Sequence, residues 1–296
     1  MRVVIAGASG FLGTHLSDHL RVHGHEVTAL VRREPSSAHE SCWDPYAGSL
    51  DQAVVDAADV VVNLAGSPLF GNPHSARYRR ELMDSRVVTT RILAEAVAAS
   101  ERPPAFLANN GTSFYGDHGA ELLTEESDSR GEALLTRVTR EWQAAAQPAL
   151  DAGARVCVLR TAPVLDRASL TLRLLRVLFK SGLAARLSSG EQYFPMISLR
   201  DWVGAATYVA ESHDISGVFN LCCPVTPTNR EFTETLAHAL HRPAFLAAPA
   251  PVLRLAAGQM APELLSSVNV RPAALERAGY DFEDEDVREV LAAALS

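Results

Sequence analysis

Short apolar runs rich in branched aliphatic residues alternate with amphipathic stretches over the first half of the chain. Such unbroken runs predict strands that are buried on both faces of a sheet. The predicted strands are 2–6, 26–31, 59–64, 105–108 and 156–160. Between these strands, one helix is predicted to begin near residue 12 and a short one to end near residue 58. Two more are predicted over 85–99 and about 131–150. Strands and helices in this alternation require an α/β fold with a doubly wound parallel sheet and right-handed crossovers.

Local signals set several element boundaries. The stretch 67–83 is polar and predicts a loop, and Trp43-Asp44-Pro45 is interpreted as a turn. A strand is predicted at 219–221, and Thr228 with Glu231 three residues later has the pattern of a capping box, which starts a helix. The buried side of the helix at 85–99 is predicted to carry Val88, Ile92, Ala96 and Ala99.

A glycine-rich turn follows the first predicted strand. It reads Gly7-Ala8-Ser9-Gly10-Phe11-Leu12-Gly13, and an amphipathic segment begins within it. Gly7 can leave the strand at φ angles that a Cβ resists, Gly10 lets the backbone approach a pyrophosphate, and Gly13 lets the helix pack closely on the sheet. Free N–H groups and the positive end of the helix dipole then face the phosphates. The turn therefore predicts a dinucleotide site, with a plain strand-to-helix turn as the alternative.

The end of the second predicted strand indicates which dinucleotide binds. A site for NAD places Asp or Glu there to bind the ribose 2′-hydroxyl. This chain has Arg32-Arg33 instead. Two guanidinium groups can hold a 2′-phosphate, and no carboxylate stands at this position to repel it. NADP(H) is therefore the expected cofactor; the alternative is that the arginines are only solvated.

Composition and charge exclude several classes of protein. With 47 % hydrophobic residues, a chain of 296 residues can build a large core in one domain or two. Its net charge of −8 argues against a nucleic-acid surface, and no apolar stretch of roughly 18 residues predicts a membrane span. The four cysteines lack metal-ligand spacing, and the N-terminal apolar run breaks at Gly7, unlike a signal peptide. We expect a cytoplasmic protein with reduced thiols, no bound metal and a small-molecule substrate.

Motifs along the whole chain resemble the extended short-chain dehydrogenase/reductase family. The N-terminal ones are the glycine run, Asn63-Leu64-Ala65-Gly66, Ser85-Arg86 with Thr89-Thr90, and Tyr115-Gly116. The C-terminal ones resemble the NAD-dependent epimerase/dehydratase branch that ends in a domain of unknown function, and they include Gly190-Glu191-Gln192-Tyr193-Phe194, Val270-Arg271-Pro272 and Gly279-Tyr280-Asp281-Phe282. The resemblance implies a Rossmann-type sheet with a smaller C-terminal α+β part that covers the substrate. The implied nucleotide domain is 1–160 plus about 197–223, and the substrate-covering part is 161–196 and 224–296.

The resemblance also implies which residues contact the cofactor. They are Gly7, Ser9, Gly10, Phe11 and Leu12 in the glycine turn, Arg32, Leu64, Ala65, Gly66, Ser85, and Asn109 at a strand end. The arguments from the residues themselves add Gly13 and Arg33. A homodimer through the helices at 85–99 and 131–150 is a further expectation by analogy with the wider family.

The catalytic residues of the wider family are missing. That family uses a Tyr-x-x-x-Lys dyad with a nearby serine, in which lysine lowers the tyrosine pKa and tyrosine exchanges a proton with the substrate. Lys180 is the only lysine of this chain, and the residue four positions before it is Arg176. The dyad is therefore absent, and its positions fall near Leu135 and Thr139. Asn110 stands where the family has the serine.

Tyr115 and Asn110 are the remaining catalytic candidates. Tyr115 can act as acid and base, but the sequence shows no positive partner that would lower its pKa from about 10; a structural tyrosine is the alternative. Asn110 offers a donor and an acceptor to the substrate or the nicotinamide, and its alternative is a turn-forming role before Gly111. Asp201 is expected to cap the helix that follows it.

Two functions fit these observations. The first is an NADP(H)-dependent oxidoreductase or epimerase-type enzyme that passes hydride to or from an unidentified small carbonyl or hydroxyl substrate. The second is a catalytically degenerate NADP(H)-binding sensor or regulatory module, which the missing dyad favours.

Overall fold

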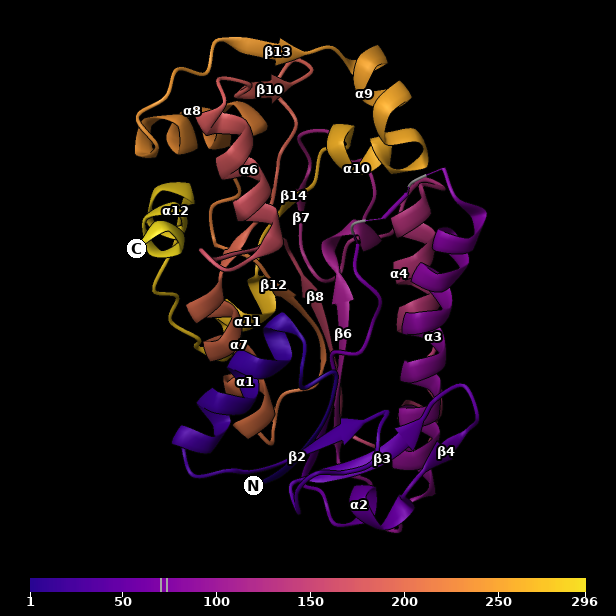
Figure 1. The fold of residues 1–296 in the computed structure, drawn as a ribbon. Helices are drawn as coiled ribbons and strands as arrows, with labels where there is room; N and C mark the ends of the chain where they lie inside the picture. The colour runs from indigo at the N-terminus through magenta and orange to yellow at the C-terminus, as the bar shows by residue number, and fades with distance from the viewer. Residues whose placement is uncertain (70, 73) are drawn as a thin grey trace. The chain divides into compact units, whose positions relative to one another are not determined.

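The computed structural model describes residues 1–69, 71–72 and 74–296 (Figure 1). Its main element is an eight-stranded sheet in the order β12-β8-β6-β5-β1-β2-β3-β4. The central strands are β1 (Arg2–Ala6), β2 (Glu26–Val31), β5 (Val60–Asn63) and β6 (Ala105–Gly111), and they pair in parallel. From the adjacent strands β1 and β5, later strands are added on opposite sides: β2 and β3 beside β1, and β6 and β8 beside β5. The carboxyl ends of β1 and β5 are therefore the switch point where ligands bind in such sheets. The predicted α/β class with a doubly wound parallel sheet is confirmed.

The outer strands are β3 (Glu40–Asp44), β4 (Ser49–Leu50), β8 (Val156–Thr161) and β12 (Gly217–Leu221). The predicted turn at 43–45 is wrong, because Trp43 and Asp44 belong to β3. Ser41, Trp43 and Pro45 are buried while Cys42 and Asp44 are exposed, which is the two-residue period of a strand with one covered face. Trp43, only 3 % exposed, packs into the core beside Leu30.

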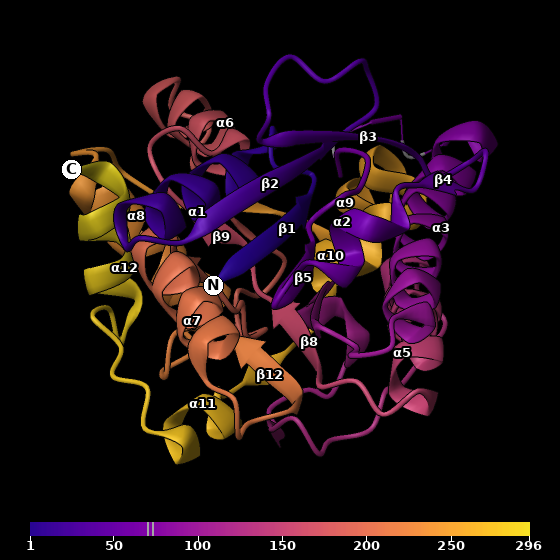
Figure 2. The ribbon, with the colours of Figure 1, turned by 90° about the horizontal axis from the view of Figure 1, so that it is seen from below.

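Helices cover both sides of this part of the sheet. They are α1 (Phe11–Val22), α2 (Gln52–Asp56), α3 (Ala76–Ala99), α4 (Leu134–Ala144), α5 (Gln147–Asp151) and α7 (Leu199–Glu211). Figure 2 shows α1 on one side of β1 and β2, with α2 and α3 on the other.

Two of the predicted helices have different bounds in the structure. The loop predicted at 67–83 ends earlier, because α3 begins at Ala76 and the hydroxyl of Ser75 accepts a hydrogen bond from the N–H of Tyr78. Ala99 is exposed, and the buried side of α3 includes Leu82, Ser85, Arg86, Thr89, Thr90, Leu93 and Val97. The helix predicted at 131–150 is two helices, because Pro148 has no N–H for a hydrogen bond and its ring clashes with the preceding turn of a continuous helix.

The chain divides into two compact units. The first unit is Met1–Asn110, Val138–Leu159 and Val203–Val218; the second unit is Gly111–Arg137, Arg160–Trp202 and Phe219–Ser296. The core of the second unit is built from Leu165, Leu172, Phe179, Phe232, Leu236, Val290 and Leu291, among others.

The second unit contains short paired strands and several helices. The strands are β7 (Leu122–Leu123), β9 (Val164–Leu165), β10 (Ala185–Leu187), β11 (Ile197–Ser198), β13 (Leu246–Ala248) and β14 (Asn269–Val270). The helices include η1 (Thr112–Phe114), α6 (Leu170–Lys180), α8 (Asn229–Ala239), α9 (Ala250–Ala257), η2 (Gly258–Met260), α10 (Ala261–Leu265), α11 (Ala273–Ala278) and α12 (Val287–Leu295). The capping box at Thr228 and Glu231 is present at the start of α8, as predicted.

Asp201 does not cap its own helix, contrary to expectation. The hydroxyl of Ser198 takes that role by accepting a hydrogen bond from the N–H of Asp201 at 3.2 Å. The carboxylate of Asp201 instead accepts the N–H groups of Glu283 and Asp284, each at 2.9 Å. Asp201 therefore stabilises a distant loop, a partner that no local sequence pattern indicates.

Candidate functional site

The Gly7–Gly13 turn joins β1 to α1 through very close backbone contacts. Gly7 has a φ of 81°, and a Cβ there would lie 2.7 Å from the carbonyl carbon of Leu64. A Cβ on Gly13 would lie 2.1 Å from the carbonyl oxygen of Gly7. Both distances are far below van der Waals contact, so neither position accepts a side chain unless the backbone moves. These are the places where the sequence argument required glycine.

The first turn of α1 is open to an anion. Its N-cap is Gly10, which supplies no side-chain cap, and the turn contains no acidic residue. Ser9 and Gly10 are exposed, while Phe11 and Leu12 are partly exposed. The orphan N–H groups of a helix start need acceptors, and a diphosphate provides them together with the charge that the helix dipole favours. The residues present therefore fit a dinucleotide.

The segment 64–66 lies beside this turn at the carboxyl end of β5. The N–H of Leu64 donates to the carbonyl of Ala6 at 2.9 Å, which ties the segment to the end of β1. The buried side chain of Asn63 accepts the N–H of Ala65 at 3.0 Å and donates to the hydroxyl of Thr90 at 2.8 Å. The structure thus brings the glycine turn and Leu64-Ala65-Gly66 together, and Asn63 ties the second of these segments to Thr90 of α3.

Ser85 reaches the same edge from α3. Its hydroxyl accepts the N–H of Ser67 at 3.0 Å, so its contact is with the residue that follows Gly66. Asn109, also predicted to contact the cofactor, lies half-buried near the end of β6.

Arg86 is a functional candidate that the sequence argument passed over. It is only 7 % exposed, and its guanidinium donates to the carbonyls of Ser67 at 3.0 Å and Leu82 at 3.1 Å and lies 5.3 Å from the ring centre of Trp142. Burial lowers the pKa of Arg86 to about 10. The contact with Ser67 makes Arg86 a support for the segment that starts at Leu64. The Ser85-Arg86 motif was visible in the sequence, but nothing in it showed that the arginine points inward.

The two arginines after β2 have different surroundings. Arg33 forms a two-pronged ion pair with Glu40 of β3, with Nη1–Oε2 and Nη2–Oε1 distances of 2.9 and 2.6 Å. Arg33 and Ser36, which donates through its N–H and hydroxyl, lower the pKa of Glu40 to about 2. Arg32 is exposed and has no hydrogen bond to the described residues. Of the two arginines, Arg32 has the guanidinium that is available to a phosphate. The ion pair of Arg33 with Glu40 was not predicted from the sequence.

The two catalytic candidates are both deeply buried. Asn110, 2 % exposed, belongs to the first unit and donates from Nδ2 to the carbonyl of Thr139 at 3.0 Å. Tyr115, 0 % exposed, belongs to the second unit, where its hydroxyl donates to Oδ1 of Asn220 at 2.7 Å and accepts from Nη1 of Arg160 at 2.9 Å. Arg160 is the positive partner that the sequence did not show, yet burial dominates and raises the pKa of Tyr115 to about 12.

Removing the Tyr115 hydroxyl should therefore be costly to folding. Tyr115→Phe leaves buried groups of Arg160 and Asn220 without this partner, and we expect the free energy of unfolding to fall by about 1–3 kcal/mol. Tyr46→Phe is the control, because Tyr46 is 57 % exposed and should change stability by less than about 0.5 kcal/mol. Urea unfolding measures both variants, and equal stabilities would contradict the assigned hydrogen bonds.

The raised pKa of Tyr115 also sets a pH dependence. The folded value of about 12 lies above the ordinary value of 10, so the neutral phenol stabilises the fold fully below pH 10. This contribution is lost as the pH rises through about 12, and it should be absent from Tyr115→Phe.

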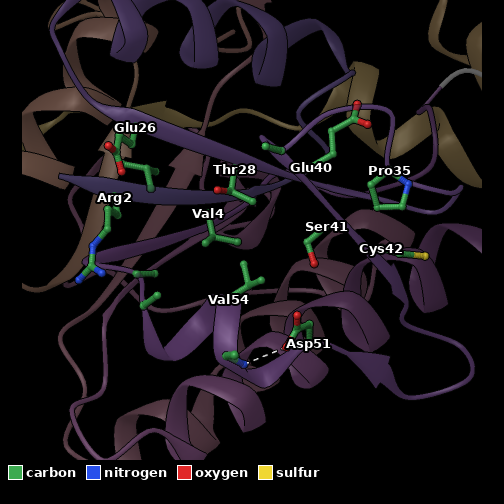
Figure 3. A pocket seen from close by; sticks show the side chains of 15 residues that line it. Arg2, Val4, Glu26, Thr28, Pro35, Glu40, Ser41, Cys42, Asp51 and Val54 are labelled. Atoms are coloured by element: carbon green, nitrogen blue, oxygen red, sulfur yellow. Dashed lines mark hydrogen bonds between the residues drawn. The ribbon is translucent and has the colours of Figure 1, made fainter.

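A separate cavity of about 570 Å³ lies in the first unit (Figure 3). Its lining includes Val4, Thr28, Glu40 and Val54, and none of the predicted site residues belongs to it. Among the described residues, no cluster of His, Cys, Asp or Glu has the geometry of a metal site. None of the helices described is long and apolar enough to cross a membrane.

Comparison with known proteins defines the class. The model of the NAD dependent epimerase/dehydratase family matches residues 3–222, and that of a domain of unknown function (DUF1731) matches residues 248–294. The chain belongs to the NAD-dependent epimerase/dehydratase family, as the motifs indicated.

Particular relatives match over nearly the whole chain. The epimerase family protein Mb2239 of Mycobacterium bovis is 38 % identical over 290 residues, which cover 98 % of this chain and 96 % of the relative. The crystal structure of human epimerase family protein SDR39U1 with NADPH has a TM-score of 0.89 at 31 % identity and covers 99 % of both chains. A nucleoside-diphosphate sugar epimerase from Corynebacterium glutamicum has a TM-score of 0.80 at 33 % identity, over all of this chain and 58 % of that one.

Proposed function

We propose that this protein is an NADP(H)-dependent oxidoreductase or epimerase-type enzyme that acts on a small carbonyl or hydroxyl substrate. The observation that carries the proposal is the closely packed glycine turn, with an uncapped helix start beside it. The human relative, similar over 99 % of its length, was crystallised with NADPH, which supports the same cofactor here.

Each part of the proposed cofactor site has a physical role. The N–H groups at the start of α1 would hold the diphosphate, and the exposed guanidinium of Arg32 would hold the 2′-phosphate. Leu64, Ala65 and Gly66 would line the cofactor, held in place by Asn63 and Arg86. When bound, NADP(H) supplies or accepts hydride, and the protein supplies orientation and the exchange of a proton.

A binding and turnover assay tests the proposal. Titration calorimetry with NADPH and NADH measures affinity, and loss of nicotinamide absorbance measures turnover with a panel of aldehydes, ketones and α-dicarbonyls. We expect saturable binding that favours NADPH, and oxidation of NADPH by at least one carbonyl. No heat with either nucleotide would refute the cofactor site.

Binding without turnover would favour the second candidate, a regulatory module that senses NADP(H). The specific observations in its favour are the absent Tyr-x-x-x-Lys dyad and the full burial of Tyr115. The homodimer and the cytoplasmic location expected from the sequence stay predictions.

A further inference from the structure

Helix α6 of the second unit has apolar side chains on two opposite faces. On its inner face, Leu172, Leu175 and Phe179 pack into the core of the unit. Four further apolar residues follow the spacing i, i+4, i+7 and i+8, which places them along one stripe of the outer face. They are Leu170, Leu174, Val177 and Leu178, which are 47 %, 44 %, 66 % and 45 % exposed. A helix that is apolar on opposite faces is normally covered on both of them, so the outer stripe indicates a docking surface.

The exposed apolar surface continues beyond the end of α6. The N–H of Leu183, which is 60 % exposed, donates to the carbonyl of Leu178 at 3.0 Å, so Leu183 folds back against the last turn of the helix. Ala185 of β10 pairs in parallel with Leu246 of β13, which brings Phe245 to the same end of this two-stranded sheet. Phe245 is 76 % exposed. We call the four outer residues of α6, together with Leu183 and Phe245, the α6 patch.

Positive charge lies along the flank of the α6 patch. Arg173, Arg176 and Lys180 are spaced i, i+3 and i+7, which places them in a third stripe of α6, between the inner and the outer faces. Arg173 and Lys180 are exposed, and the Nε atom of Arg176 has no hydrogen-bond partner among the described residues. The segment 167–186 contains five cationic residues and no Asp or Glu, although the whole chain has a net charge of −8. Such a local excess of positive charge in an acidic protein favours an anionic partner.

The composition of the α6 patch favours a lipid surface over a protein partner. Binding energy at protein interfaces comes mainly from Trp, Tyr and Arg, and Leu and Val are under-represented among the residues that supply it. The α6 patch contains Leu, Val and one Phe, without Trp or Tyr. A symmetric contact with a second copy of the chain would bring the same cationic stripe close to itself, and like charges there oppose association. Leucines beside Arg and Lys on a helix are typical of elements that lie on anionic membranes.

We propose that the α6 patch docks on the surface of a bilayer that contains anionic phospholipids. A helix needs about 20 residues to span the hydrocarbon core, so the 11 residues of α6 can only lie along one surface. In that position the leucine and valine side chains enter the boundary between headgroups and acyl chains. Arg173, Arg176 and Lys180 reach lipid phosphates, with their apolar stems along the same boundary. The inference goes beyond the proposed enzymatic function and does not depend on cofactor binding.

Co-sedimentation of the whole chain with lipid vesicles tests the proposal. Wild type should sediment with vesicles of equimolar phosphatidylcholine and phosphatidylglycerol, bind vesicles of phosphatidylcholine alone at least about tenfold more weakly, and dissociate as the salt concentration rises. Val177→Glu replaces the most exposed of the four outer residues with a charge. It should lower the partition coefficient at least about tenfold, which is the contribution of one buried valine side chain. Val22→Glu is the matched control, because Val22 is 83 % exposed at the end of α1 in the first unit, and it should bind within about threefold of wild type.

A second pair of variants separates charge from apolar contact. Arg173→Gln combined with Lys180→Gln removes two exposed cations from the flank and should weaken binding about 30-fold, since each cation near an anionic surface contributes about fivefold. Arg77→Gln combined with Arg91→Gln is the control with the same change in net charge, because both arginines are exposed on α3 of the first unit. It should bind within about threefold of wild type. Thermal unfolding of all four variants should match that of wild type, because every substituted side chain is exposed.

Other uses of this surface give different results in the same measurements. Absence of binding to the anionic vesicles, or equal losses in a variant and its matched control, would overturn the inference. Binding that does not respond to salt or to the loss of Arg173 and Lys180 would overturn it as well, because the lipid charge would then play no part. If sedimentation velocity shows a dimer that Val177→Glu dissociates, and wild type does not bind vesicles, the α6 patch is an interface between two copies of the chain and the lipid proposal is wrong.

Discussion

Gly7→Ala is expected to weaken NADPH binding about 10- to 100-fold, while Gly24→Ala leaves it within about threefold. The first estimate corresponds to the roughly 1–3 kcal/mol that an overpacked position costs. The two glycines are a matched pair, because their φ angles are 81° and 80°. Backbone strain from an added Cβ is therefore nearly the same in both variants.

The surroundings of the two positions differ. A Cβ at Gly7 would meet the Leu64 backbone at 2.7 Å, whereas a Cβ at Gly24 would have no atom within 4 Å. Relieving the clash must move the glycine turn away from Leu64 and Ala65, and both sides of that contact are proposed to touch the cofactor. Calorimetric titration with NADPH, together with thermal unfolding of the free protein, separates the loss of affinity from the strain that both variants share. Similar affinities for the two variants would show that this close contact does not shape the site.

Arg32→Ala should raise the Kd for NADPH about 10- to 100-fold and leave the Kd for NADH within about twofold. A charge-assisted hydrogen bond to a phosphate is worth about 1.5–3 kcal/mol, and NADH has no 2′-phosphate to lose it. The exposed side chain of Arg32, without a bond to the described residues, is free to make that contact. Equal losses for both nucleotides would contradict the assignment of Arg32 to the 2′-phosphate.

Arg33 and Glu40 provide the comparison for this prediction. Arg33→Ala should weaken NADPH binding less than Arg32→Ala, because the Arg33 guanidinium is already paired with Glu40. Glu40→Gln removes that carboxylate, which is ionised at neutral pH because its pKa is about 2. This variant should bind NADPH more tightly than wild type, by about two- to tenfold, since it frees Arg33 and removes a negative charge. Weaker binding by Glu40→Gln would show that the ion pair instead orders the segment for the nucleotide.

Local and periodic features were readable from the sequence. Unbroken apolar runs such as 60–62 identified the strands of the parallel sheet, because most side chains of a strand covered on both faces are shielded from water. The glycines at 7, 10 and 13 identified the turn, since each acts through the absence of its own Cβ. The capping box of Thr228 and Glu231 was equally local and is present in the structure.

The sequence did not predict structure that depends on pairing or packing with another segment of the chain. Trp43 was predicted to lie in a turn with Pro45, but it belongs to β3, where it pairs with Leu50 of β4. Arg86 was identified only as part of the Ser85-Arg86 motif. Its burial was not predicted, because it depends on carbonyl groups and on Trp142, which lies on another helix.

The sequence by itself determined the α/β class, the family and the glycine turn, because these depend on chain periodicity and on contacts between near neighbours. Only the tertiary structure decided the surroundings of the polar groups: Arg160 and Asn220 around Tyr115, Glu40 against Arg33, and Ser113 with Leu135 around Glu263. The charge and pKa of a side chain depend on burial and on partners a few ångströms away in space. Those partners lie up to about 150 positions apart in the sequence, as Ser113 and Glu263 do, and only the folded chain brings them together.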